Sequence, residues 1–139
     1  MARETSTEVV SVSQAAREAN EYIRGRFQVD ADDRSGQGAL RISGWALGMS
    51  SRAIGVEILV GDEVIGRAAV GIRRPDVVEH FPELPDAGAS GFKLTLVPQT
   101  SGESELLIRA VLEGGMRVPM GTIQASVSRT RRLWQRRRG

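Results

Sequence analysis

The chain has 139 residues, 40% hydrophobic and 4% aromatic, with no cysteine. This length fits one domain with a core built mainly from Val, Ile, Leu and Ala, and the lack of cysteine excludes disulfides and thiolate metal sites. Six of the 19 basic residues follow Ser128, and all 17 acidic residues precede it. Residues 1–128 therefore hold 13 basic and 17 acidic residues, a net charge of −4, and the C-terminal end carries +6.

Residues 1–25 are predicted to form a polar N-terminal segment followed by a helix. Apolar side chains recur at helical spacing from Val12 to Ile23, Ser11 with Gln14 fits a capping box, and Gly25 fits a helix C-terminus. The stripe is small and Ala-rich, so it could pack on the domain or against a second chain. No apolar run approaches the ~20 residues needed to span a bilayer, and none forms a secretory signal, so we expect a cytoplasmic chain.

Residues 26–127 are predicted to form an all-β domain. Apolar residues alternate with other residues at Leu40, Ile42 and Ala46, and the same period recurs over residues 56–60, 92–96 and 106–110. Gly61-Asp62 is a hairpin turn signal, and Pro119 indicates an edge position or a bulge in the last strand. About six or seven short strands at this spacing predict an antiparallel sandwich.

The segment 73–81 interrupts the strand pattern with one expected helical turn that begins at Pro75. In one interpretation Asp76 caps this turn and Arg74 pairs with a neighbouring acid. In the other, Arg73, Arg74 and Asp76 line a polar ligand-binding surface. His80 is expected to be a solvated residue on the turn.

Catalytic residues, metal ligands and cofactor sites are not predicted anywhere in the chain, and no enzyme is expected. No nucleophile elbow or phosphate-binding loop is present. Residues 30–36 depart from a calcium loop, because Arg34 and Ser35 stand where a ligand and a glycine are required. Trp45 is expected to lie in the core between the sheets; an exposed indole could instead stack on a sugar ring.

Residues 128–139 form an Arg-rich tail that we expect to bind polyanions, and we expect its part from Arg129 to Gly139 to be disordered alone. The apolar pair Leu133 and Trp134 favours an anionic membrane surface over nucleic acid, and a solvated end without a ligand is the alternative. The predicted polyanion-binding residues are Arg129, Arg131, Arg132, Trp134, Arg136, Arg137 and Arg138.

An ordered set of short motifs carries a family resemblance over residues 30–124. It comprises Gly44-Trp45-Ala46-Leu47, Val56-Glu57-Ile58, Ile65-Gly66-Arg67-Ala68, Arg74-Pro75-Asp76-Val77, Phe81-Pro82 and Ser90-Gly91-Phe92. In this order they resemble an immunoglobulin-like accessory module that occurs beside glycosyltransferase and methyltransferase domains in bacterial polysaccharide-assembly proteins.

The resemblance implies an immunoglobulin-like sandwich without catalytic activity. It implies an accessory or binding module of bacterial cell-envelope polysaccharide machinery that contacts a protein partner or a glycan. The tail lies outside the resemblance, and from its own residues we expect it at the inner face of the membrane. The alternative is a small nucleic-acid-binding protein that uses the tail. The oligomeric state is left open by the sequence.

Overall fold

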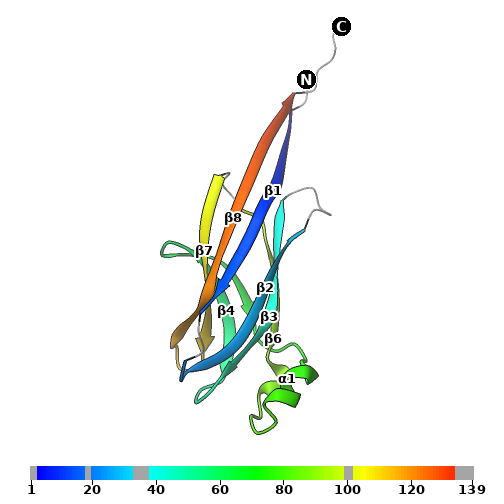
Figure 1. Ribbon diagram of the computed structural model, residues 1–139. Helices are drawn as coiled ribbons and strands as arrows, with labels where there is room; N and C mark the ends of the chain where they lie inside the picture. The colour runs from blue at the N-terminus through cyan, green and yellow to red at the C-terminus, as the bar shows by residue number, and fades with distance from the viewer. Residues whose placement is uncertain (1–2, 18–19, 33–37, 99–101, 134–139) are drawn as a thin grey trace.

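The computed structural model describes residues 3–17, 20–32, 38–98 and 102–133, which form two antiparallel sheets packed face to face (Figure 1). The larger sheet has the strand order β1-β8-β7-β4-β5 and the smaller one β2-β3-β6. The predicted antiparallel sandwich is confirmed, with eight strands in the described residues instead of six or seven. The elements are β1 (Arg3–Ala16), β2 (Ile23–Asp32), β3 (Ala39–Gly48), β4 (Ala53–Val60), β5 (Glu63–Ala69), α1 (Pro75–His80), η1 (Ala87–Ala89), β6 (Gly91–Leu96), β7 (Gly102–Leu112) and β8 (Arg117–Leu133).

The core lies between the two sheets and follows the period of two. Leu40 and Ile42 of β3 are fully buried, as are Ile58 of β4 and Ile108 of β7. Successive side chains of a strand point to opposite faces, so the residues between them face outward on the two sheets. Gly61, at a φ of 58°, makes the expected tight turn between β4 and β5.

The predicted N-terminal helix is wrong, because the described residues between 11 and 25 contain no helix. Residues 11–16 belong to β1, which pairs with β8, and Gly25 lies inside β2 opposite Ala46. Val12 packs against the core from β1. Long-range pairing with β8 overrides the weak local helix propensity of this segment, because propensity is a small term beside sheet formation and burial.

Gln14, which fits a helix-capping box in the sequence, instead joins the two sheets. Its side-chain amide donates to the carbonyl oxygen of Phe27 at 2.5 Å and its side-chain oxygen accepts from the backbone N–H of Val29 at 2.8 Å. β1 and β2 are edge strands of different sheets, and an unpaired strand edge leaves backbone donors and acceptors unsatisfied. The Gln14 side chain therefore satisfies part of the β2 edge and closes the sandwich there.

The boundary predicted after Val127 falls inside a strand. β8 continues to Leu133, and its backbone pairs with β1 as far as Arg3 opposite Leu133. Arg129, Arg131 and Arg132 are thus strand residues, a correction to a tail that was expected to be disordered from residue 129. The two strands extend beyond the rest of the sandwich as a ribbon (Figure 1). Trp134, Arg136, Arg137 and Arg138 lie outside the described residues.

Pro119 marks a bulge. The pairing of β7 with β8 shifts register between Ile108 and Arg109, next to the position where Arg109 faces Pro119. The pairing of β1 with β8 ends at Ala16 opposite Gly121, so in the described residues Pro119 has a strand partner only on the β7 side, and its missing N–H donor is tolerated there. Both sequence expectations for Pro119, a local edge position and a bulge, are therefore observed.

Candidate functional site

The excursion between β5 and β6 carries α1 and η1 and packs on the outer face of β3. Leu47 of β3 is buried against Val77 of α1 and Ala87 of η1, with exposed fractions of 1%, 1% and 0%. Pro75 begins α1 as expected, since its fixed φ suits the first helical position. This second, smaller core is separate from the one between the sheets.

The two ends of this excursion are tied together at Gly91. Ile72 and Gly91 form an isolated antiparallel bridge, and the N–H of Ala46 donates to the carbonyl oxygen of Ser90 at 2.9 Å. A Cβ at Gly91 would lie 2.9 Å from the Ile72 carbonyl oxygen and 2.9 Å from Cγ of Arg74. Glycine therefore permits the close approach that fixes α1 against β3.

Trp45 is half-buried at the margin of this second core and does not lie between the sheets as predicted. Its strand neighbours Gly44 and Ala46 face the main core side, so the pleat of β3 directs the indole outward. The ring centroids of Trp45 and Phe81 are 5.8 Å apart with an interplanar angle of 55°. This tilted arrangement is a favoured aromatic pair geometry and forms an apolar wall that still reaches solvent.

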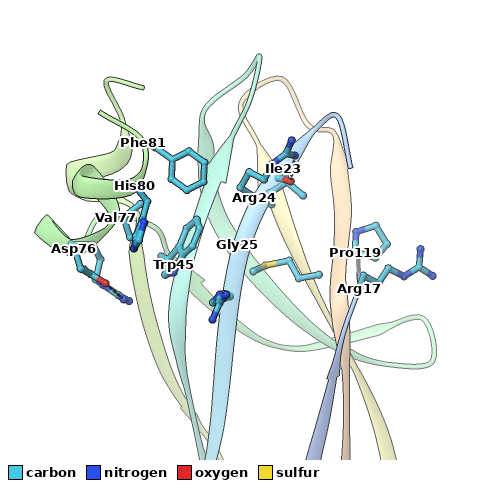
Figure 2. Close-up of a pocket in the computed structure, with 13 residues that line it drawn as sticks. Arg17, Ile23, Arg24, Gly25, Trp45, Asp76, Val77, His80, Phe81 and Pro119 are labelled. Carbon is cyan, nitrogen blue, oxygen red and sulfur yellow. Dashed lines mark hydrogen bonds and ion pairs between the residues drawn. The ribbon is translucent and has the colours of Figure 1, made fainter. Parts of the chain in front are cut away.

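A hollow of about 800 Å³ lies beside this wall, in the size range of ligand pockets. Figure 2 shows Trp45 and Phe81 between α1 and β2, with Asp76 and His80 on the α1 side. Arg17 and Pro119 lie on the other side of β2 (Figure 2). The hollow is lined by Arg17, Ile23, Arg24, Gly25, Arg26, Trp45, Arg74, Asp76, Val77, His80, Phe81, Pro119 and Met120; we call it the Trp45 hollow.

Arg74 and Asp76 form a two-bond ion pair at the α1 end of the Trp45 hollow. Nε of Arg74 donates to Oδ1 of Asp76 at 2.9 Å and Nη2 donates to Oδ2 at 2.7 Å. These hydrogen bonds lower the pKa of Asp76 to about 2 and raise that of Arg74. Asp76 lies in the first turn of α1, but no side chain makes a capping hydrogen bond at the N-terminus of this helix, so the expected capping by Asp76 is not observed. The pairing expected in the structural interpretation is present, and both residues also line the hollow.

The free positive charge of the hollow comes from β2 and from the end of β1. The Nη1 group of Arg24 donates to the carbonyl oxygens of Asn20 and Ile23, which hold the side chain without neutralising it. Arg26 and Arg17 are exposed and form no ion pair with a described residue. With Arg74 and Asp76 cancelling, the lining carries three uncompensated guanidinium groups, which favour an anionic ligand.

Of the three residues predicted to line a ligand surface, the structure brings two together in the hollow. Arg73 is exposed before α1 and does not line it. Arg24, Arg26 and Phe81 were missed as site residues. Arg24 and Arg26 alternate with the buried Ile23 and Phe27, a strand pattern that the helix interpretation concealed.

The described residues contain no group of three histidine, aspartate or glutamate side chains that could hold a metal ion. Within the same described ranges, no helix is long and apolar enough to cross a membrane.

No protein-family model and no curated protein matches this sequence. Among solved structures, the crystal structure of chicken MD-1 complexed with lipid IVa is similar, with a TM-score of 0.36 and 10% sequence identity. The alignment covers 88% of this chain and 98% of that chain. A likeness this distant carries no argument about the ligand of this chain.

Proposed function

We propose that this chain is a non-catalytic binding module whose Trp45 hollow takes an acidic glycan. The observation that supports this most is the combination of the Trp45–Phe81 pair with three uncompensated arginines around one hollow. An aromatic face packs against the apolar C–H face of a sugar ring, and guanidinium groups bind carboxylates through paired hydrogen bonds.

The resemblance to immunoglobulin-like accessory modules gives this proposal its setting in bacterial envelope-polysaccharide machinery. There the ligand would be a growing or finished polysaccharide, and a catalytic partner would be a separate domain or protein. The proposal places the module in the cytoplasm at the inner membrane face, on the strength of the basic C-terminal end. Nucleic-acid binding through that end is the alternative, and it makes no use of the hollow.

Fluorescence titration can test the glycan proposal directly. Trp45 and Trp134 are the two tryptophans, so a Trp134→Phe background leaves Trp45 as the sole indole. Oligogalacturonate should shift the Trp45 emission, and maltohexaose, a neutral sugar of similar length, should bind at least tenfold more weakly. Arg26→Gln should weaken oligogalacturonate binding about three- to tenfold, the loss of one exposed charge-assisted contact.

Arg41→Gln is the matched control, because Arg41 is an exposed arginine on the same outer sheet face but outside the hollow. It should leave binding unchanged within twofold. Equal weakening by both variants would mean diffuse charge attraction and would contradict a site at Trp45. No emission change with either sugar would remove the glycan proposal and leave a protein partner as the ligand of the module.

A further inference from the structure

Glu57 is a buried carboxylate on the outer face of the five-stranded sheet, away from the Trp45 hollow. It is only 5% exposed, although its neighbours Val56 and Ile58 point into the core and Glu57 therefore points outward. Its cover consists of arginine side chains. Arg67 on β5 and Arg109 on β7 are its direct cross-strand partners, and Arg117 reaches it from β8.

All three guanidinium groups converge on this one carboxylate. Nε of Arg109 lies 2.9 Å and its Nη2 group 2.8 Å from Oε1 of Glu57. Nε of Arg117 donates to the same oxygen at 3.2 Å, and Nε of Arg67 donates to Oε2 at 3.2 Å. Three positive charges surround one negative charge, so the cluster has an excess of +2.

The pKa of Glu57 is consistent with a permanently charged centre. Burial raises the pKa of Glu57, but the hydrogen bonds from Arg109, Arg117 and Arg67 and the charge of Arg109 together lower it below the ordinary value. Glu57 is therefore ionised at neutral pH and orders the guanidinium groups without cancelling their charge.

The three arginines differ in how many of their nitrogens contact Glu57 and in how exposed they are. Both Nε and Nη2 of Arg109 contact Glu57, and the Arg109 side chain is 23% exposed. Arg67 uses Nε, and its two terminal nitrogens make no hydrogen bond to a described residue; its side chain is 70% exposed. Arg117 uses Nε and Nη1, the latter for the Gly115 carbonyl oxygen, and is 49% exposed.

We propose that this cluster is a binding site for a dianionic oxyanion of the phosphate class, held by the outer ends of Arg67 and Arg117. The excess of +2 matches a dianion, and guanidinium groups present planar pairs of N–H donors that fit phosphate oxygens. Glu57 and Arg109 are positioning residues: the carboxylate holds the guanidinium groups close together before any ligand arrives. This site is independent of the glycan proposed for the Trp45 hollow.

The test is a titration of the full chain with inorganic phosphate at constant ionic strength, followed by NMR of the arginine Nε–Hε groups. Shifts should be largest at Arg67, Arg109 and Arg117. Arg67→Gln and Arg117→Gln should each weaken phosphate binding at least tenfold. Arg52→Gln is the control, an exposed arginine that pairs with Glu113 and lies outside the cluster, and it should change binding less than twofold.

Glucose 1-phosphate, with glucose as its neutral control, separates the sources of the phosphate group. Equal affinity for glucose 1-phosphate and inorganic phosphate supports a site for the anion alone, and tighter binding of the sugar phosphate supports a phosphorylated sugar as the ligand. Shifts spread evenly over all arginines, or equal weakening by Arg52→Gln, would overturn the proposal. So would chloride shifting the same signals as strongly as phosphate.

Glu57→Gln provides a second readout through stability. The substitution keeps the side-chain shape but removes the carboxylate that holds the three guanidinium groups together, so phosphate should raise its thermal unfolding midpoint by fewer degrees than that of the unmodified chain. An equal rise in both would show that the anion acts elsewhere. Trp45→Ala, which alters the Trp45 hollow and the margin of the second core but not the arginine cluster, should leave phosphate binding unchanged.

Discussion

Val77 is the buried residue of α1, and Val77→Ala should loosen the packing of α1 on β3. Val77 is 1% exposed and contacts Leu47 and Ala87 in the small second core. Removing two buried methyl groups costs about 0.8 kcal/mol each by transfer, and the cavity left behind adds to this, so we expect a loss of about 1.5–3 kcal/mol.

Val78 offers a matched control one residue away. It is 39% exposed on the same helix, so Val78→Ala removes the same two methyl groups from a side chain that is already partly in solvent. That variant should cost less than about 0.5 kcal/mol, as surface substitutions usually do. Urea denaturation followed by circular dichroism measures both changes in the free energy of unfolding.

The local effect can be separated from the global one by hydrogen exchange. In Val77→Ala the amides of α1 should exchange faster, while those of β4 and β7 in the main core should change no more than global stability requires. Oligogalacturonate should bind more weakly, because Phe81 and Asp76 reach the Trp45 hollow only when α1 is docked. Equal costs for Val77→Ala and Val78→Ala would refute the second core, and unaltered exchange in α1 would refute its role in holding the helix.

Other substitutions test the remaining parts of the fold. Gln14→Ala should destabilise the chain by about 1–3 kcal/mol in urea denaturation, because two hydrogen bonds to the β2 backbone are lost; a neutral result would contradict the sheet-joining role. Gly44→Ala should prevent proper β2–β3 pairing, since a Cβ there would collide with the Arg26 carbonyl oxygen, whereas Gly71→Ala meets nothing within 4 Å and should fold normally, as thermal denaturation would reveal. Glu57→Gln should destabilise the chain at pH 7, because charge-assisted hydrogen bonds to three arginines are lost. The pKa of Glu57 in the folded chain is lowered, so the difference in stability between the two chains is fully present above pH 4.5, the ordinary pKa of a glutamate. It should vanish as the pH falls through the lowered pKa of Glu57. Denaturation at several pH values would check this.

Parts of this fold follow from local patterns that the sequence displays directly. The alternation at Leu40, Ile42 and Ala46 identified the core face of β3, because the side-chain period of a strand is a property of its backbone. Gly61 predicted a turn because glycine tolerates a positive φ, and Pro75 predicted a helix start because its φ is fixed. Both are properties of the single residue.

Residues 11–25 show where local reasoning ends. Their apolar spacing fits a helix, yet the partner that makes β1 a strand is β8, more than 100 positions away in the register of Val12 with Ala125. The local pattern of a segment shows which of its faces is apolar. It does not show which distant segment will form hydrogen bonds with its backbone. Trp45 illustrates the same limit. It was predicted to lie between the two sheets, but it lies on the outer face of β3, where it packs beside α1.

The two candidate sites were decided by tertiary structure. The Trp45 hollow combines residues of β2, β3, α1 and β8 with Arg17, which follows β1. Only the packing of α1 on β3 brings Arg74 and Asp76 near Arg24 and Arg26. Arg67, Arg109 and Arg117 lie 10, 52 and 60 residues from Glu57 in sequence. The sequence alone determined that this chain is a β-sandwich with an uneven charge distribution. Sheet order and strand register decided which of those charges meet, because cross-strand neighbours are set by long-range pairing and not by proximity along the chain.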